Sequence, residues 1–235
     1  NYRMTISRTD TVIVVGFLIL VQGTGALAGF WLPAIAPEVG QSLGLSPSLI
    51  AYPVLILYIF AMVSSLMAGG IVRRFGAWRS SQAALILIGV SHLMFMNGSL
   101  LFLALGSIIL GGAYGLLTPP ASHLLSKIVT PKNRNLIFSI RFTGVPIGGI
   151  LAGLLAPSVA LEYGWRDSMI VTIVISLVIA ISMQPFRKRW DIDRLKSAKI
   201  FRNPISDIYL VWKLSALKWV ALSGLCMGAI QTTLT

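Results

Sequence analysis

The stretch GGIVRRFGAWRSS, Gly69–Ser81, places three arginines between two long apolar runs of a chain that is otherwise poor in charge. Hydrophobic residues make up 56% of the 235 residues and charged residues 11%, which is far from the composition of soluble domains. A hydrocarbon core about 30 Å thick needs roughly 20 apolar residues in a helix, and such runs recur along the chain. The sequence therefore predicts an all-α polytopic membrane protein.

Six apolar runs are complete, and a seventh begins near Leu217. The predicted spans cover residues 11–31, 48–72, 80–97, 99–125, 136–160 and 167–186. We expect three parts: a six-helix bundle over 1–186, a basic linker over 187–216 and the start of helix seven over 217–235. The linker mixes aromatic and basic residues, so it is either an amphipathic helix on the inner leaflet or a solvated tether.

Basic residues gather in alternate loops between the predicted spans. One set of segments holds Arg3 and Arg8; Arg73, Arg74 and Arg79; Lys127, Lys132 and Arg134; and the residues from Arg187 to Lys218. The opposite loops hold almost none. The positive-inside rule then predicts a cytoplasmic N-terminus in a plasma or inner membrane. The net charge of +12 reflects this topology, so we expect a lipid bilayer and no nucleic acid as partner.

Two pairs of segments repeat at nearly constant spacing. GALAGFWLP (Gly25–Pro33) shares Gly-x-x-x-Gly-x-x-x-Pro with GGAYGLLTP (Gly111–Pro119), about 86 residues later. RFGAWRS is echoed by EYGWRDS, whose glycine, Gly164, follows Gly76 by about 88 residues. Helices one to three thus correspond to helices four to six. Because each triplet has an odd number of spans, the sequence predicts a three-plus-three inverted repeat.

The opening stretch resembles the loop between helices two and three of the major facilitator superfamily, which reads Gly-x-x-x-Asp-Arg-x-Gly followed by basic residues. The resemblance extends over the whole chain. It implies two six-helix bundles and secondary active transport of a small solute by alternating access. Because the chain starts at Asn1 and ends at Thr235 inside the seventh run, we expect it to hold the first half, with the C-terminal half of the same protein as partner.

One position of that loop departs from the family pattern. Arg73 stands where the family has an acidic residue, which is thought to cap a helix and join a charge relay that latches the cytoplasmic side. Arg73 cannot take that role, so a latch here would need an acidic partner elsewhere. We expect the arginines to set topology and leave a gating role open. The candidate gating residues are Gly69, Arg73, Arg74, Gly76 and Arg79.

A second resemblance lies in RFTGVPIGGILAGLLAP, Arg141–Pro157. Its core is similar to the Gly-Pro-x-x-Gly-Gly pattern that many antiporters of the family carry in helix five, with the proline displaced by one position. Glycines and a proline kink suit a helix that slides against its neighbour, although plain helix packing explains them equally well. The residues concerned are Gly144, Pro146, Gly148 and Gly149.

Arg141 falls about five residues inside helix five, where a charge is expensive and usually functional. Either it faces the central cavity, where it would attract an organic or inorganic anion, or it snorkels to the cytoplasmic interface. In the resembled family, helices one, two, four and five face the cavity. Their polar residues are therefore further candidates for binding the solute: Gln22, Tyr58, Tyr114 and Thr118.

Enzyme signatures are absent from the sequence. It has no cluster of His and Cys at metal-ligand spacing, no nucleotide-binding loop and no serine with a plausible His-acid partner. We expect no enzymatic activity, no cofactor and no metal. Symport, antiport and uniport stay open, as does a coupling ion. The main rival is a sensor or scaffold of the same fold that does not transport.

Overall fold

The computed structural model describes residues 7–46, 49, 51–198, 200, 212–214, 217–224 and 226, and the regular secondary structure within them is helical. The chain forms two compact units, Asn1–Ile200 and Phe201–Thr235. In the second unit residues 217–224 are helical. Residues 201–211 of the predicted linker and 227–235 of the predicted helix seven lie outside the described residues. The expected division into bundle, linker and seventh helix stays a prediction.

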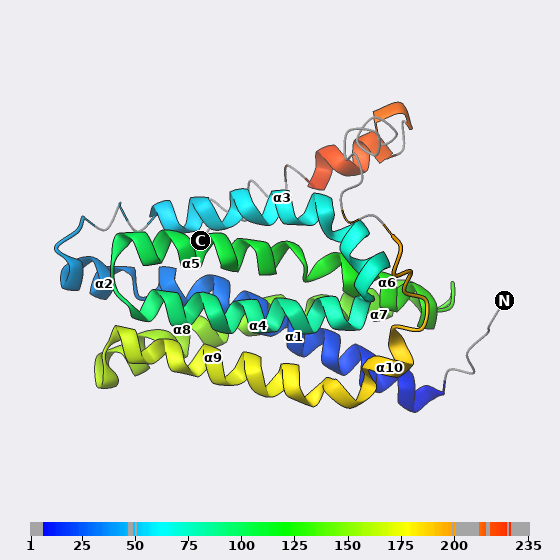
Figure 1. Ribbon diagram of the computed structural model, residues 1–235, viewed down its shortest axis with the longest axis horizontal. Coiled ribbons are helices and arrows are strands. Elements are labelled where there is room, and N and C mark those ends of the chain that lie inside the picture. The colour runs from blue at the N-terminus through cyan, green and yellow to red at the C-terminus, as the bar shows by residue number, and fades with distance from the viewer. Residues whose placement is uncertain are drawn as a thin grey trace. The chain divides into compact units, whose positions relative to one another are not determined.

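The first unit is a bundle of long helices (Figure 1). Its elements in chain order are α1 (Arg8–Ala34), α2 (Ala36–Leu43), α3 (Ala51–Phe75), α4 (Ala77–Met96), α5 (Leu100–Gly115), α6 (Thr118–Ile128), α7 (Arg134–Phe142), α8 (Gly144–Tyr163), α9 (Trp165–Ser182), the 3-10 turn η2 (Gln184–Phe186) and α10 (Arg187–Trp190). Predicted helices one, two, three and six are α1, α3, α4 and α9. Helix four is divided into α5 and α6, and helix five into α7 and α8.

Five segments are long and apolar enough to cross a membrane among the described residues: Arg8–Ala34, Ala51–Phe75, Leu100–Ile128, Arg134–Tyr163 and Trp165–Trp190. The sixth predicted span, α4, is long enough but less apolar. Apart from Arg79, its polar residues are buried inside the bundle, and most of them bond to backbone carbonyls. Gln82, for example, donates to the carbonyl of Ala180 on α9 at 2.8 Å. The lower hydropathy of α4 thus follows from its position against other helices.

The main helix interfaces repeat in the way that the sequence repeat requires. The most extensive contacts are those of α1 with α8, α3 with α5 and α4 with α9. In span numbers these are one with five, two with four and three with six. If spans one, two and three change places with spans four, five and six, the interface of one with five becomes the interface of four with two. The interface of three with six stays the same. The inverted repeat is therefore a property of the packing as well as of the sequence.

The two matched glycines adopt the same backbone conformation at equivalent turns. Gly76 (φ 97°, ψ 152°) joins α3 to α4, and Gly164 (φ 88°, ψ 149°) joins α8 to α9. Positive φ is costly for residues with a Cβ, so glycine fits both turns. Each turn is followed by a buried tryptophan, Trp78 or Trp165, whose indole N–H bonds to another part of the bundle. The same local chemistry thus connects the last two helices of each triplet.

Glycines also let helices of different triplets approach closely. A Cβ on Gly148 of α8 would lie 2.9 Å from the Cβ of Ala26 on α1 and would clash with the carbonyl oxygen of Gly23. On α5, a Cβ on Gly115 would lie 2.8 Å from the Cβ of Ser64 on α3. Helices in lipid associate largely by such close packing, because no hydrophobic effect drives them together.

We predict that Gly148→Ala destabilises the bundle, because the added methyl group meets backbone that cannot move aside. Overpacking of this kind costs about 1–3 kcal/mol. The matched control is Gly153→Ala on the same helix, where no atom lies within 4 Å of an added Cβ. Alanine has a higher helix propensity than glycine, by up to about 1 kcal/mol, so Gly153→Ala should not lower the stability of the bundle. Thermal unfolding in detergent measures both variants, and equal unfolding temperatures would contradict the packing argument.

Candidate functional site

Arg141, in the last turn of α7, is fully buried. Its Nη2 donates to Oε1 of Gln22 on α1 at 2.8 Å, and its guanidinium carbon lies 4.8 Å from the centre of the Phe142 ring. The side chain is therefore enclosed by protein and does not lie on the surface of the bundle. It lies inside the bundle, where α7 and α1 meet.

Two nitrogen atoms of Arg141 are buried without a hydrogen-bond partner, Nε and Nη1. Among the described residues, none of the ion pairs includes Arg141. An unpaired charge inside a protein costs several kcal/mol, because the desolvation of the ion is not repaid. A guanidinium offers its N–H groups as a planar fork that matches a carboxylate or phosphate. The arrangement is suited to binding an anion.

Two spans are broken at similar distances from their basic ends. The break between α7 and α8 lies at Thr143, which is nine residues or about 14 Å from Arg134 along the helix. The break between α5 and α6 lies at 116–117, about 16 Å from Ile128. Broken helices near the membrane midplane mark binding sites in many transporters, because their free backbone groups meet the substrate. The break in helix five follows Arg141 directly.

Proline accounts for both breaks. Pro146 has no N–H to donate to the carbonyl four residues earlier, which belongs to Phe142, the last residue of α7. Pro119 has the same relation to Gly115, the last residue of α5. The kink expected at Pro146 is thus a break located three residues earlier, and Pro146 itself lies in the first turn of α8, where proline is tolerated.

The other glycines predicted in helix five differ in their surroundings. Gly144 approaches the carbonyl oxygen of Ile19 and the backbone N–H of Gly23 on α1, in line with the close packing of Gly148. Gly149 has more room, since an added Cβ would make ordinary contact, at 3.5 Å, with the ring of Phe30. The close approach therefore involves Gly144 and Gly148.

The predicted cavity residues form two pairs and one isolated position. Arg141 and Gln22 are hydrogen-bonded. Tyr58 and Tyr114 pack edge to face, with ring centres 6.2 Å apart, and Tyr114 also lies against Gly29 of α1. Gly29 follows Gln22 by seven residues, so the two pairs contact α1 about 10 Å apart along its axis. Thr118, the first residue of α6, is exposed, and within the described part of the chain no side-chain hydrogen bond joins it to either pair.

At the basic end of the bundle, Asp191 caps α4 from more than 110 residues away in sequence. Its Oδ1 accepts the backbone N–H of Trp78 at 2.8 Å, and its Oδ2 accepts that of Arg79 at 3.1 Å. These are the second and third residues of α4, the positions that an N-cap side chain normally satisfies. Gly76, the residue at the N-cap, has no side chain, and Asp191 fills the space that its Cβ would occupy.

The candidate gating residues are arranged around this cap. Arg73 and Arg74 are exposed, and neither forms an ion pair among the described residues. The carbonyl of Arg73 accepts the backbone N–H of Leu195 at 2.8 Å. Arg79 lies nearest to an acid, with its Nε 3.6 Å from Oδ2 of Asp191. An acidic partner thus exists for the loop, but it meets Arg79 rather than Arg73. Gly69 has no atom near its missing side chain.

Further contacts hold the segment after α9 against the bundle. Asp193 accepts hydrogen bonds from Lys127 at 2.6 Å and pairs with His123 at 2.8 Å, both on α6. Arg189 pairs with Asp10 of α1 at 2.6 Å. The first part of the predicted linker, through Leu195, is therefore bonded to the bundle. In Figure 1, α6, α7 and α10 lie at the same end.

Asp191 and Asp193 were not singled out from the sequence. The available signal was a pair of acids in an otherwise basic stretch directly after Trp190, which is buried and stacks on Trp78 with ring centres 6.2 Å apart. That pattern suggests a segment returning to the protein surface. It does not indicate which helix end the carboxylate would meet.

The two carboxyl groups have opposite shifts in pKa. Burial raises the pKa of Asp191 to about 6, although the bond from Trp78 and the charges of Lys127 and His123 act to lower it. For Asp193, burial also acts to raise the pKa, but the bonds from Lys127 and His123 outweigh it and lower the pKa below the ordinary 3.8.

Comparison with known proteins relates nearly the whole chain to one family. The family model described as Major Facilitator Superfamily matches residues 16–235. A curated gallate transporter of Pseudomonas putida is 28% identical over 167 residues, which are 68% of this chain and 35% of that protein. The chain thus spans about a third of the length of this relative.

Solved structures of a peptide transporter, POT, share the fold. The structure in complex with sulfate has a TM-score of 0.64 at 18% identity and covers 94% of this chain and 46% of that one. A mutant of POT in complex with alafosfalin has a TM-score of 0.58 at 21% identity, covering 95% and 45%. Each match extends over less than half of the solved chain.

We predict that Asp191 makes the bundle less stable as the pH rises from about 4 to about 6. In this window the folded protein holds a proton on Asp191 that the unfolded chain, with a carboxyl pKa near 3.8, has lost. The stability that this proton contributes is present below pH 4 and is lost as the pH rises through the folded pKa.

The measurement is the unfolding temperature in detergent between pH 4 and pH 7.5 for wild type, Asp191→Asn and Asp193→Asn. The difference in unfolding temperature between wild type and Asp191→Asn should become smaller as the pH rises, because wild type loses stability. Asp193→Asn is the matched control, because the pKa of Asp193 is lowered rather than raised, so the stability that Asp193 contributes should not fall as the pH rises. A constant difference between wild type and Asp191→Asn would show that burial does not govern this carboxyl.

Proposed function

Because the chain belongs to the major facilitator superfamily, we propose that it forms the N-terminal half of a secondary active transporter that moves a small organic or inorganic anion by alternating access. The C-terminal half of the same protein supplies the other wall of the substrate path. The transport step moves a solute between two sides of a membrane, so no enzymatic step, cofactor or metal is proposed. The coupling ion stays open.

The observation that carries the anion proposal is the unpaired guanidinium of Arg141. Gln22 satisfies one of its nitrogens, while Nε and Nη1 have no partner. The one acidic residue within the predicted spans is Asp167, which is exposed in the first turn of α9. Asp10, just before the first span, pairs with Arg189 instead. A negatively charged group of the substrate supplies the missing bonds, and a charge-assisted bond to guanidinium is about twice as strong as a neutral one.

The proline breaks and the glycine interfaces support movement at this place. The substrate is held where α7 ends and α8 begins, so a change in the relative position of α8 and α1 reaches Arg141 directly. At Gly144 and Gly148 the α1 and α8 backbones approach closely, with no side chain from these two residues between them. Such a surface allows one helix to slide on the other, which a rocking bundle requires.

The curated relative supports the substrate class. It is a transporter of gallate, an aromatic carboxylate. In the present chain, the Tyr114 ring, which packs on Tyr58, and the Arg141 guanidinium contact α1 about 10 Å apart along its axis. We propose that the charged group of the solute meets Arg141 and that its remaining part extends toward the tyrosine pair. Thr118 is a further candidate at the break in helix four.

We expect Arg141→Gln to reduce anion uptake by about 10- to 100-fold, because a hydrogen bond to a charged group contributes about 1.5–3 kcal/mol. The measurement is uptake by the full-length protein in proteoliposomes from a panel of anions, sugars and cations. Arg134→Gln removes an exposed arginine of the same helix and should transport normally. Normal anion uptake by Arg141→Gln would contradict the proposal, and a wild type without flux for any solute would favour the sensor or scaffold.

We also propose that the N-terminus and the basic end of the bundle are cytoplasmic. In a background in which the exposed Cys226 is replaced by serine, new cysteines at the exposed positions Asn97 and Lys132 report the two sides. A membrane-impermeant maleimide added to intact cells should label Asn97→Cys at once and Lys132→Cys only after permeabilisation. The reverse pattern would overturn the orientation.

A further inference from the structure

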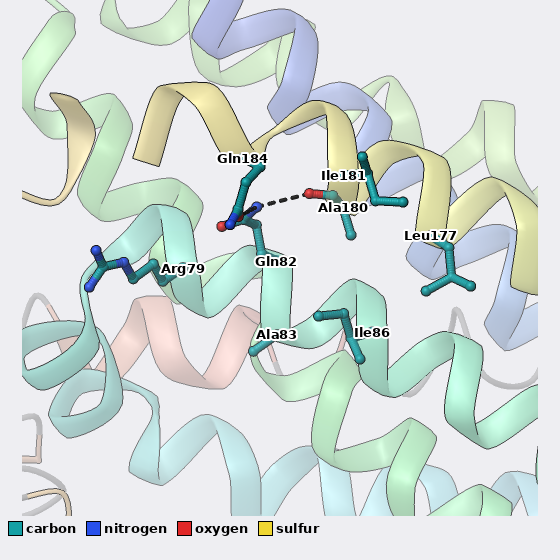
Figure 2. Close-up of a pocket in the computed structure, with 8 residues that line it drawn as sticks. All are labelled: Arg79, Gln82, Ala83, Ile86, Leu177, Ala180, Ile181 and Gln184. Carbon is teal, nitrogen blue, oxygen red and sulfur yellow. Dashed lines mark hydrogen bonds between the residues drawn. The ribbon is translucent and has the colours of Figure 1, made fainter. Parts of the chain in front are cut away.

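A groove of about 490 Å³ runs between α4 and α9 on the surface of the bundle. Figure 2 shows its lining, in which residues of α4 face residues of α9 and η2. The residues are Arg79, Gln82, Ala83 and Ile86 on one side and Leu177, Ala180, Ile181 and Gln184 on the other. None of them is among the residues proposed to bind the solute.

The groove has a polar end and an apolar end. Gln82 donates to the carbonyl of Ala180 and, at 3.0 Å, to Oε1 of Gln184, so the two glutamine side chains are bonded within the protein. Ile86 and Leu177 lie farther along and are exposed. An exposed apolar channel along two spans is a natural seat for an acyl chain in a bilayer.

Arg79 lies at the polar end of the groove. In Figure 2 its guanidinium points away from the apolar end. Its side chain is 30% exposed, and its Nε is buried without a hydrogen-bond partner. Asp191, the one acid within ion-pair distance among the described residues, already accepts two backbone N–H groups of α4. Arg79 therefore keeps donors that can bind an anion at the membrane surface.

The charge around Arg79 favours an anionic rather than a neutral headgroup. Arg187 and Lys188 follow η2 at the same end of α9. Phosphate matches the fork of a guanidinium, and anionic lipids of the cytoplasmic leaflet attract basic residues that lie just outside a span. An apolar channel that ends at such an arginine is complementary to a phospholipid in both its parts.

We propose that the groove between α4 and α9 binds one anionic phospholipid, with its phosphate against Arg79 and an acyl chain along Ala83, Ile86, Leu177 and Ile181. The bound lipid bridges the third and sixth spans. Its phosphate also neutralises the charge of Arg79. Because Asp191 caps α4 at the same place, the lipid and Asp191 both bind the N-terminal end of α4.

The test uses the purified full-length protein in detergent, titrated with phosphatidylglycerol or phosphatidylcholine and followed by native mass spectrometry. We expect wild type to retain one phosphatidylglycerol more tightly than phosphatidylcholine. Arg79→Gln should weaken that binding about five-fold, since one basic residue at a membrane surface contributes about 1 kcal/mol. Lys132→Gln removes an exposed charge between α6 and α7, outside the groove, and should bind as wild type does.

Ala83→Trp is the second variant, because Ala83 is exposed and the indole would fill the channel while Arg79 stays in place. It should weaken both lipids. The proposal is overturned if folded Arg79→Gln binds phosphatidylglycerol as wild type does, if Lys132→Gln loses as much affinity as Arg79→Gln, or if folded Ala83→Trp binds normally. Displacement of the lipid by excess glycerol phosphate would also overturn the proposal, because the site would then bind the headgroup without the acyl chain. Lipid binding in detergent does not depend on transport.

Discussion

The structure depends on one constraint: in a hydrocarbon layer, every backbone N–H and C=O must find its partner within the chain. Helices meet this requirement locally, which is why the described residues form helices and little else. The constraint also explains where helices stop. The breaks at 116–117 and at Thr143 follow the carbonyls that Pro119 and Pro146 cannot bond, and both lie within spans that pack on other helices rather than in loops at the surface.

Close contact between helices has a different origin. Lipid tails are as apolar as the side chains, so association relies on dispersion and on backbones that can approach. The glycines of α8 meet α1, and those of α5 meet α3, in interfaces that exchange under the internal repeat. The third interface, between α4 and α9, carries more polar bonds. The bundle thus combines two smooth interfaces, suited to sliding, with one that is hydrogen-bonded.

The two charged regions of the bundle follow opposite rules. At the basic end, Asp10, Asp191 and Asp193 each have a cationic or backbone partner, and the segment after α9 is held to α1, α4 and α6. The resemblance to the family implies a carboxylate within the loop between helices two and three. Here Arg73 occupies that position, and Asp191 caps the following helix from another part of the chain. Inside the bundle, by contrast, Arg141 lacks a counter-charge. A charge left unpaired at such cost is better explained by a ligand than by stability.

The sequence alone determined the fold, since apolar runs of spanning length and a repeated Gly-aromatic pattern specify helices, their number and their inverted relation. It also singled out Arg141 as a candidate, because a charge inside an apolar run is visible without coordinates. It did not determine that Gln22 meets Arg141, that Asp191 caps α4 or that the break precedes Pro146. Hydropathy and spacing describe one helix at a time, whereas these contacts join residues more than a hundred positions apart or depend on a local break. Only tertiary packing decides which helix faces touch, and therefore which buried polar atoms are satisfied and which remain free to bind.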